Sequence, residues 1–177
     1  MKTLKTLLVT GARGTVGSYV TGLAEASGYR VIATDMSRAG VRSPVRGEVR
    51  VADLRDAAAL DDLVNGCDAV IHTAAQLDAG ADSAELSRTN TDAVANLYEA
   101  SARAGAQRFI QVSNATLYAP STSGAPLDEE SEIAPRGPFG MSKRAAETYL
   151  LGQRGHLPSV TVLRAAPIYG RRGRHFA

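Results

Sequence analysis

The sequence has few of the residues that mark secreted, metal-rich or membrane-spanning proteins. Its 177 residues include one cysteine, Cys67, and no tryptophan, and only 5% of them are aromatic. A single cysteine excludes an intrachain disulfide framework and a multi-cysteine zinc site. No apolar run reaches the roughly 20 residues that cross a bilayer. The N-terminus from Met1 to Lys5 does not resemble a signal peptide. We therefore expect a cytoplasmic protein that contacts no membrane.

The chain also has no large excess of positive or negative charge. The chain has 20 Lys and Arg against 18 Asp and Glu, a formal net charge of +2, which is too small to argue for a nucleic-acid partner. His156 and His175 are far apart and without supporting carboxylates, so we expect no metal site. A hydrophobic fraction of 44% fits a soluble globular protein. We expect residues 1–177 to form a single domain with a substantial core.

A glycine-rich turn between an expected strand and an expected helix organises the chain. The apolar residues 7–9 precede Thr10–Gly17, and residues 18–26 read as a helix. In a parallel α/β sheet such a turn holds a dinucleotide, because its glycines allow a tight turn and a close approach to the pyrophosphate. The amides and dipole of the helix start attract phosphates. The candidate cofactor-binding residues here are Gly11, Arg13, Gly14, Thr15, Val16 and Gly17.

Carboxylates follow the next two expected strands. Asp35 ends a strand at residues 29–34, about 20 residues past the glycines, where a ribose-binding acid is expected. Asp53 follows a strand at residues 49–51. Arg13 and Arg38 would favour a 2′-phosphate, but Asp35 would repel one, so we expect NAD rather than NADP. Met36, Asp53 and Leu54 join Asp35 as candidate cofactor residues. A sheet of this kind without a cofactor is the alternative.

Strand and helix signals alternate along the rest of the chain. The pattern predicts helices at 56–64, about 83–104 and 139–153, strands at 68–75, 109–113 and 160–164, and loops at 37–47 and 114–138. Such alternation is typical of an α/β fold with a parallel sheet covered on both faces. We expect a Rossmann-type, doubly wound sheet in three layers. Cys67 and His72 read as buried side chains next to or within the strand at 68–75.

Several motifs resemble those of the extended short-chain dehydrogenase/reductase family, in its NAD-dependent epimerase/dehydratase branch. The resemblance covers almost the whole chain and rests on TGxxGxxG at 10–17, the VSSxxVYG-like residues 112–119, the YGxSKxxxE-like residues 139–147 and the LRxxxVYG-like residues 163–170. It implies an NAD(P)-binding Rossmann domain acting on a small alcohol or carbonyl substrate such as a nucleotide sugar. It adds Thr73, Ala74, Ala75, Asn90 and Lys143 to the candidate cofactor residues, although Ala93 and Val94 replace the Gly-Thr of the family's NxxGTxN helix.

The chain departs from the family at the catalytic positions. The family uses a Tyr, ionised by a nearby Lys, to move a proton, while a Ser or Thr holds the substrate oxygen. Phe139 stands at the Tyr position and Asn114 at the Ser/Thr position, and Lys143 is retained. Phenylalanine cannot carry a proton, whereas an asparagine amide can still donate to a carbonyl. The candidate catalytic residues are Lys143, Asn114, Ser113, Thr116 and the degenerate Phe139. Ser113 takes the role of Asn114 if the alignment shifts by one.

Three explanations of Phe139 remain open. First, the chain is a natural pseudo-enzyme or an enzyme with reassigned chemistry. Second, it carries a deliberate Tyr→Phe substitution. Third, another group transfers the proton in place of the family's Tyr. That group would be Tyr118, a carboxylate at 128–130, or water. The function is then either an NAD-dependent epimerase, dehydratase or reductase, or a catalytically silent NAD-binding scaffold, sensor or helper.

The resemblance also bears on length and assembly. Family members continue past the residues equivalent to 163–170 into a smaller region that closes over the substrate. We expect that region to be absent or truncated, or supplied by a partner chain. The resemblance implies a homodimer through the helices at 83–104 and 139–153.

Overall fold

The computed structural model describes residues 4–38, 47–77, 80–120, 124, 126–153 and 155–169. Within these ranges one six-stranded sheet has the order β3-β2-β1-β4-β5-β6, with every neighbouring pair parallel. The order confirms the predicted doubly wound sheet. Residues 39–46 of the predicted loop and the tail from 170 lie outside the described residues. The strands are β1 (Thr6–Thr10), β2 (Arg30–Asp35), β3 (Glu48–Val51), β4 (Ala69–His72), β5 (Arg108–Asn114) and β6 (Ser159–Ala165).

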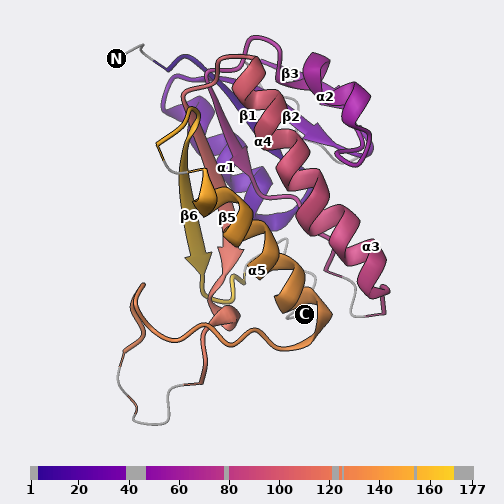
Figure 1. The fold of residues 1–177 in the computed structure, drawn as a ribbon. Helices are drawn as coiled ribbons and strands as arrows, with labels where there is room; N and C mark the ends of the chain where they lie inside the picture. The colour runs from indigo at the N-terminus through magenta and orange to yellow at the C-terminus, as the bar shows by residue number, and fades with distance from the viewer. Residues whose placement is uncertain are drawn as a thin grey trace.

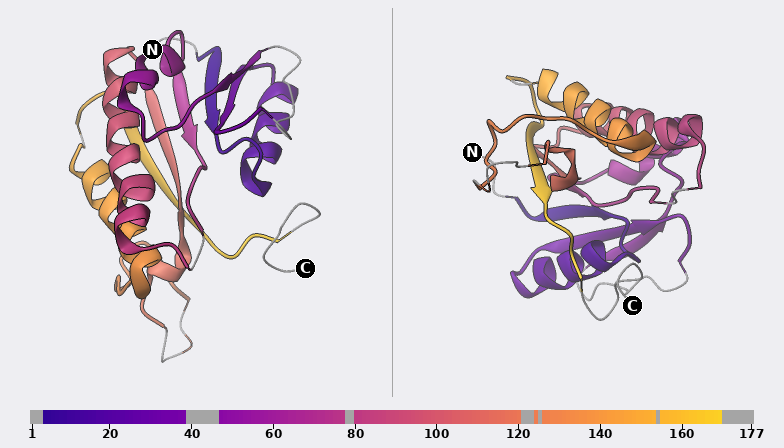
Figure 2. Two further views of the ribbon diagram at one scale, coloured as in Figure 1. Left: turned by 90° about the vertical axis from the view of Figure 1, so that its right-hand side faces the viewer. Right: turned by 90° about the horizontal axis from the view of Figure 1, so that it is seen from below.

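Helices cover both faces of the sheet (Figure 1). Seen from below, α5 and α4 form one layer, the sheet the next and α1 the third (Figure 2). The helix α2 shares a hydrophobic core with α4 and α5, so it belongs to their layer. The three layers confirm the predicted architecture. The helices are α1 (Thr15–Ala26), α2 (Ala57–Val64), α3 (Ser83–Ser87), α4 (Ala93–Arg103) and α5 (Gly137–Gly152).

Two cores explain why the central strands read as apolar runs rather than alternating ones. Leu8 and Phe109 point into a larger core under α2, α4 and α5. Val9 and Val31 point into a smaller core under α1. Since β1 is buried along its whole length on both faces, nearly every position in it is apolar or small.

The predicted helix at 83–104 differs from a single α-helix. It consists of α3, one π-helical turn η1 (Arg88–Asp92) and α4 in succession. A short 3₁₀ helix η2 (Ala115–Leu117) lies in the segment predicted as loop. The helix α1 begins at Thr15 rather than residue 18, because Gly14 already serves as its N-cap. Asp56 is the N-cap of α2, since its carboxylate accepts from the amide of Ala58.

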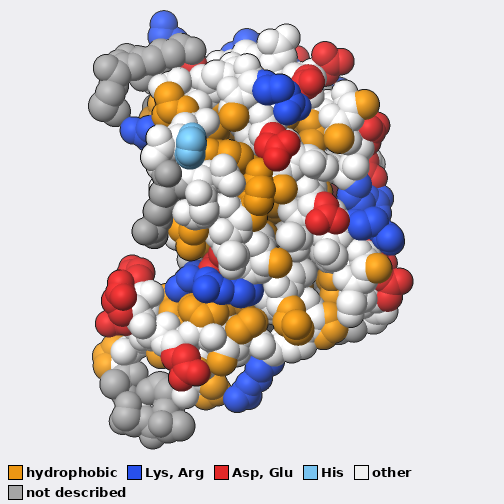
Figure 3. Space-filling model, in the orientation of Figure 1, with side chains coloured by type: hydrophobic (Ala, Val, Ile, Leu, Met, Phe, Trp, Pro, Cys, Tyr) orange, Lys and Arg blue, Asp and Glu red, His pale blue; other side chains and the backbone are white. Residues whose placement is uncertain are grey.

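The chain reverses its direction of winding between β1 and β4. From β1 it moves outward through β2 to β3, and from β4 it moves the other way to β6. In open parallel sheets ligands bind at the carboxyl ends of the strands beside this point. Acidic and basic side chains are interspersed over the face formed by α4 and α5 (Figure 3), in keeping with the small net charge.

Candidate functional site

The glycine-rich turn that follows β1 packs against the residues that follow β4. Gly11 has φ of +66°, and a Cβ there would lie 2.8 Å from the Cα of Ala74. A Cβ on Gly17 would overlap the carbonyl oxygen of Gly11. The turn therefore needs glycine at both positions, as the sequence pattern predicts.

The start of α1 has no side-chain cap. Gly14 is its N-cap and offers no side chain to bond the amides of the first turn, and that turn contains no acidic residue. These amides and the positive end of the helix dipole suit a phosphate. Thr15 and Val16 also line a hollow of about 290 Å³, bounded on its other side by Ile168 and Tyr169.

Asp35 is bonded directly to the glycine-rich turn. Its Oδ2 accepts from the amide of Arg13 at 3.0 Å, and its Oδ1 accepts from the amide of Met36 at 3.0 Å. The Met36 side chain is exposed. The carboxylate at the end of β2 thus lies beside the turn, which is the arrangement that a ribose-binding acid requires.

The second predicted acid has a different environment. Asp53 forms a two-oxygen contact with the guanidinium of Arg55, with 2.6 Å between Nη2 and Oδ2. The hydrogen bond from Arg55 holds the pKa of Asp53 below its ordinary value. Leu54, also predicted to bind the cofactor, packs partly buried against the larger core.

Hydroxyl groups lock the end of β1 to the turn after β4. Thr10 Oγ1 accepts from the amides of Thr73 and Ala74 at 3.2 and 3.3 Å. The Thr73 hydroxyl donates to the Thr10 carbonyl at 2.6 Å. Thr73, Ala74 and Ala75 are partly buried here. Thr73 and Ala74 therefore pack directly against Gly11.

His72 and Cys67 are buried, as predicted. His72 Nδ1 lies 2.8 Å from Thr10 Oγ1, and burial together with the charge of Lys143 lowers its pKa to about 3. The ring is therefore neutral at ordinary pH. Burial raises the pKa of the Cys67 thiol to about 12, so it is not a reactive thiolate.

Asn90 lies in the π-helical turn η1 and bonds protein groups on two sides. Its Oδ1 accepts from the Gln76 amide at 2.8 Å, and its Nδ2 donates to the Gln76 carbonyl at 3.1 Å and to Ser142 Oγ at 3.2 Å. Ser142 Oγ in turn donates to the carbonyl of Phe139. Asn90 thus ties the loop after β4 to the first turn of α5, and its role as a cofactor ligand stays a prediction.

The predicted catalytic residues meet where β5 ends beneath α5. Lys143 is only 4% exposed, and its Nζ donates to the Val112 carbonyl at 3.0 Å. Burial lowers the pKa of Lys143 to about 8, and the negative charge of Glu147 partly opposes this. Phe139 lies one helical turn before Lys143 and is partly buried.

The two candidate substrate-holding residues differ in exposure. Ser113 is buried, and its Oγ has no hydrogen-bond partner among the described residues. Asn114 is less buried, and its Oδ1 caps η2 by accepting from the Thr116 amide at 2.8 Å. The cap uses only the carbonyl oxygen, so the Asn114 NH₂ group keeps its capacity to donate. The Thr116 side chain is exposed.

An ion pair between α5 and β6 was not predicted. Glu147, 1% exposed, accepts from Nε and Nη2 of Arg164 at 2.9–3.2 Å. Arg164 Nη1 donates to the Tyr118 hydroxyl at 2.9 Å, and its guanidinium lies 4.9 Å from the centre of that ring. The hydrogen bond to Glu147 raises the pKa of Arg164. A charged residue, Arg164, within an otherwise uncharged strand was the signal in the sequence.

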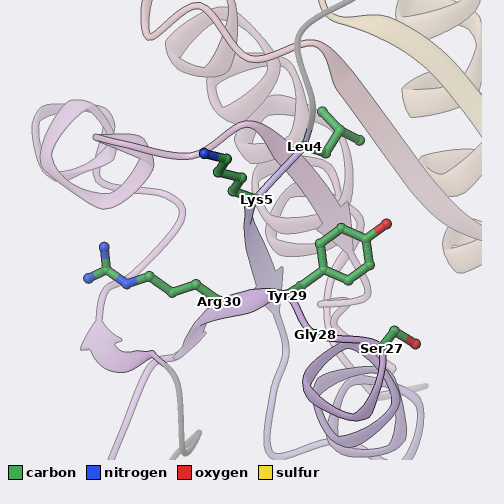
Figure 4. A pocket seen from close by; sticks show the side chains of 6 residues that line it. All are labelled: Leu4, Lys5, Ser27, Gly28, Tyr29 and Arg30. Carbon is green, nitrogen blue, oxygen red and sulfur yellow. The ribbon is translucent and has the colours of Figure 1, made fainter.

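A second hollow lies away from these residues. It measures about 450 Å³ and is lined by residues 4–5 and 27–30, at the amino ends of β1 and β2. Figure 4 shows the charged ends of Lys5 and Arg30 pointing away from Tyr29. Because ligands of parallel sheets bind at the carboxyl ends, this hollow is not the cofactor site.

The described ranges contain no cluster of three or more His, Cys, Asp or Glu side chains able to hold a metal ion. None of their helices combines the length and the apolar character that crossing a membrane needs.

Comparison with known proteins identifies similar chains. The model of the NAD dependent epimerase/dehydratase family matches residues 7–177. A dTDP-glucose 4,6-dehydratase of Streptomyces niveus is 35% identical over 130 residues, which is 71% of this chain and 37% of that protein. The chain spans about half the length of most of the curated relatives it matches.

Two solved structures have the same fold. A short-chain dehydrogenase/reductase superfamily protein from Agrobacterium tumefaciens, with bound NAD, has a TM-score of 0.79 and 30% identity over 90% of this chain and 48% of its own. A UDP-glucose 4-epimerase from Thermotoga maritima, with UDP-glucose, has a TM-score of 0.85 and 28% identity over 94% of this chain and 57% of its own.

Proposed function

Because this chain belongs to the NAD-dependent epimerase/dehydratase family, we propose that it binds NAD and oxidises or reduces a nucleotide-sugar-like substrate. The cofactor would lie at the carboxyl ends of β1, β2 and β4. The NAD in the Agrobacterium structure and the UDP-glucose in the Thermotoga structure support these two ligand classes by similarity. The observation that carries the proposal is the bond between Asp35 and the glycine-rich turn.

The described residues fit a dinucleotide. The close approach of Gly11 to Ala74 and the uncapped start of α1 leave backbone amides for the pyrophosphate. The Asp35 carboxylate would accept from the ribose hydroxyls and would repel a 2′-phosphate, so NAD is preferred to NADP. When bound, NAD would accept or return a hydride.

The residues at the end of β5 would handle the substrate. The Asn114 amide would donate to the reacting oxygen in place of the family's hydroxyl. Lys143 would bond the nicotinamide ribose, and Ser113 and Thr116 are nearby alternatives to Asn114. Phe139 supplies no proton, so the triad is atypical.

A catalytically silent NAD-binding scaffold, sensor or helper is the second candidate. Phe139 favours it, because it removes the hydroxyl that normally transfers the proton. A domain of this kind would still bind NAD.

The test compares the chain with its Phe139→Tyr variant, using UDP-glucose and dTDP-glucose as probes. We expect the variant to reduce NAD at least tenfold faster, because a positioned acid–base group contributes about 10²–10⁴-fold. Adding Lys143→Met to this variant should remove the gain. If neither chain turns over while both bind NAD, the silent alternative is correct for these substrates.

Three further proposals concern the domain, the assembly and the location of the protein. We propose that residues 1–177 form one NAD(P)-binding domain, that two chains pair through the helices at 83–104 and 139–153, and that the protein is cytoplasmic. The exposed Met141 on α5 supports an interface there.

A further inference from the structure

Two of the groups that could replace the missing tyrosine hydroxyl, Tyr118 and Asp128, are engaged in other contacts. The Tyr118 hydroxyl accepts from Arg164, whose guanidinium also lies over the Tyr118 ring. Asp128 accepts from the Ser131 hydroxyl at 2.9 Å and from the Glu130 amide at 3.1 Å, so it organises its own loop. Residues 128–130 are exposed. The Lys143 amine is the next candidate group in the site.

We propose that the Lys143 amine itself carries the proton in this protein, in place of a tyrosine hydroxyl at position 139. This inference rests on the proposed function, because it assigns a role within that same site. It adds to Lys143 a task distinct from bonding the ribose. Three features of its surroundings support it.

The first feature is that no carboxylate among the described residues bonds to Lys143. Its Nζ donates to the carbonyl of Val112, which also accepts from Gln111 Nε2 at 3.1 Å. Glu147 lies one turn further along α5, but three hydrogen bonds engage its carboxylate with Arg164 of β6. A buried amine beside neutral partners loses its proton more readily than an exposed one.

The second feature is a set of buried polar atoms on the face of the sheet that α5 covers. Ser113 Oγ, Gln111 Oε1 and His72 Nε2 are buried and have no partner among the described residues. His72 and Gln111 are paired neighbours in β4 and β5, so their side chains share the face of the sheet covered by α5. Unpaired buried polar atoms of this kind are bridged by water in folded proteins. Such water would pass protons to and from Lys143.

The third feature is the electrostatic balance of the site. The charged or titratable groups around Lys143 are Arg144 and Glu147 on its own helix, Arg164 on β6 and His72 on β4, and Arg144 Nη1 lies 3.5 Å from Glu147 Oε2. Glu147 and Arg164 largely neutralise each other, and His72 is uncharged at ordinary pH. Burial therefore dominates and lowers the pKa of Lys143 to about 8, near working pH.

The step is a balanced transfer. The neutral amine forms an N–H bond with the proton of the substrate hydroxyl as that O–H bond breaks. The carbon–hydrogen bond breaks at the same carbinol centre and leaves a carbonyl, and NAD⁺, when bound, would supply the acceptor for the hydride. The ammonium returns the proton in the reverse direction. Asn114 would donate to the oxygen throughout.

The sequence makes the test direct, because the chain has three lysines, Lys2, Lys5 and Lys143. Lysine labelled with ¹³C at Cε gives three signals whose shifts report protonation. Lys143→Arg assigns the signal, and Lys5→Arg is the matched control that leaves it unchanged. Spectra are recorded across pH on the full chain, with and without NAD, and calorimetry on the same samples measures NAD binding.

We expect the Lys143 signal to titrate near pH 8. A Lys143 midpoint near 10.5 with NAD bound would overturn the inference, because the amine would then hold its proton throughout. Loss of NAD binding with a midpoint near 8 would instead defeat the proposed function and leave Lys143 a buried amine without a reaction. With any nucleotide sugar that the chain oxidises, Lys143→Arg should lower the rate at least 100-fold at pH 8.

Discussion

Lys143 and His72 show how burial dominates the protonation of two neighbouring side chains. Lys143 belongs to α5 and His72 to the sheet, and the pKa of each is lowered chiefly because the charged form loses its hydration. The histidine becomes a neutral structural group bonded to Thr10. The lysine, whose pKa falls only to about 8, stays able to exchange a proton near neutral pH.

Burying Lys143 costs folding free energy, which Lys143→Met should recover. The folded-state pKa of about 8 lies below the ordinary 10.5, so the unfolded chain holds the proton more tightly. Folding is therefore weakened below pH 8, and the loss disappears as pH rises to 10.5. Urea unfolding should show Lys143→Met more stable by about 2 kcal/mol at pH 7.

The gain should shrink towards zero at pH 10.5, and Lys5→Met should show no such trend. An equal gain at every pH would mean that packing, rather than charge burial, explains the effect.

At the scale of elements, the Glu147–Arg164 pair joins α5 to β6 and thereby fixes Lys143 over the end of β5. Arg164 lies opposite Ser113 in the β5–β6 register, so its guanidinium reaches the helix from the strand beside the site. Glu147 is 1% exposed, so the helix holds a buried carboxylate whose charge needs this partner.

Removing Arg164 should be costly for that reason. Arg164→Met leaves the buried Glu147 charge with only the longer 3.5 Å contact to Arg144, and we expect a loss of about 3 kcal/mol in the free energy of unfolding. The exposed Arg103–Asp61 pair is the matched control, and Arg103→Met should cost less than about 1 kcal/mol. Denaturant melts measure both, and the Glu147→Gln/Arg164→Met double variant should be more stable than Arg164→Met alone. Equal losses at the two arginines would refute the assigned burial effect.

Helices, strands and turns were predictable where the local sequence pattern determines them. They were not predictable where a contact between residues distant in the sequence determines them. Gly11 and Gly17 marked the turn because only glycine fits those positions. The division of the helix at 83–104 has no breaker residue in the sequence. The division occurs where Asn90 bonds Gln76 and Ser142, which lie 14 and 52 positions away in the sequence. Contacts over such sequence distances cannot be inferred from helical periodicity.

At the scale of the whole molecule, the exposed face formed by α4 and α5 is the proposed dimer surface. Met141 on α5 is 64% exposed, and Tyr149 on α5 bonds Glu99 on α4 at 2.9 Å, which joins the two helices into one surface. A large exposed apolar side chain on such a surface suits an interface.

A charge placed on this surface should separate the proposed dimer. Met141→Glu would bury a carboxylate in the interface, so sedimentation should show a monomer. Leu23→Glu, at a 70% exposed position on α1, should leave the assembly unchanged. A wild-type chain that sediments as a monomer would contradict the proposal.

The fold class and the family followed from the sequence, because alternating strands and helices with a glycine-rich turn leave few arrangements. The environment of the site residues could not be predicted from the sequence. Asp53 bonded to Arg55, Tyr118 bonded to Arg164 and the orphan polar atoms near Lys143 depend on side chains that come together only in the folded chain. Sequence pattern predicted where Lys143 lies, but not the burial that changes its chemistry.

The most direct test of the account is calorimetry of NAD binding to the chain and to Asp35→Ala. We expect NAD to bind the wild type and to bind Asp35→Ala at least tenfold more weakly, because the variant loses the acceptor for the ribose hydroxyls. The exposed Asp62→Ala on α2 is the matched control and should bind as the wild type does. Absence of NAD binding by the wild type, or equal affinity in Asp35→Ala, would contradict the central claim that the turn and Asp35 form a cofactor site.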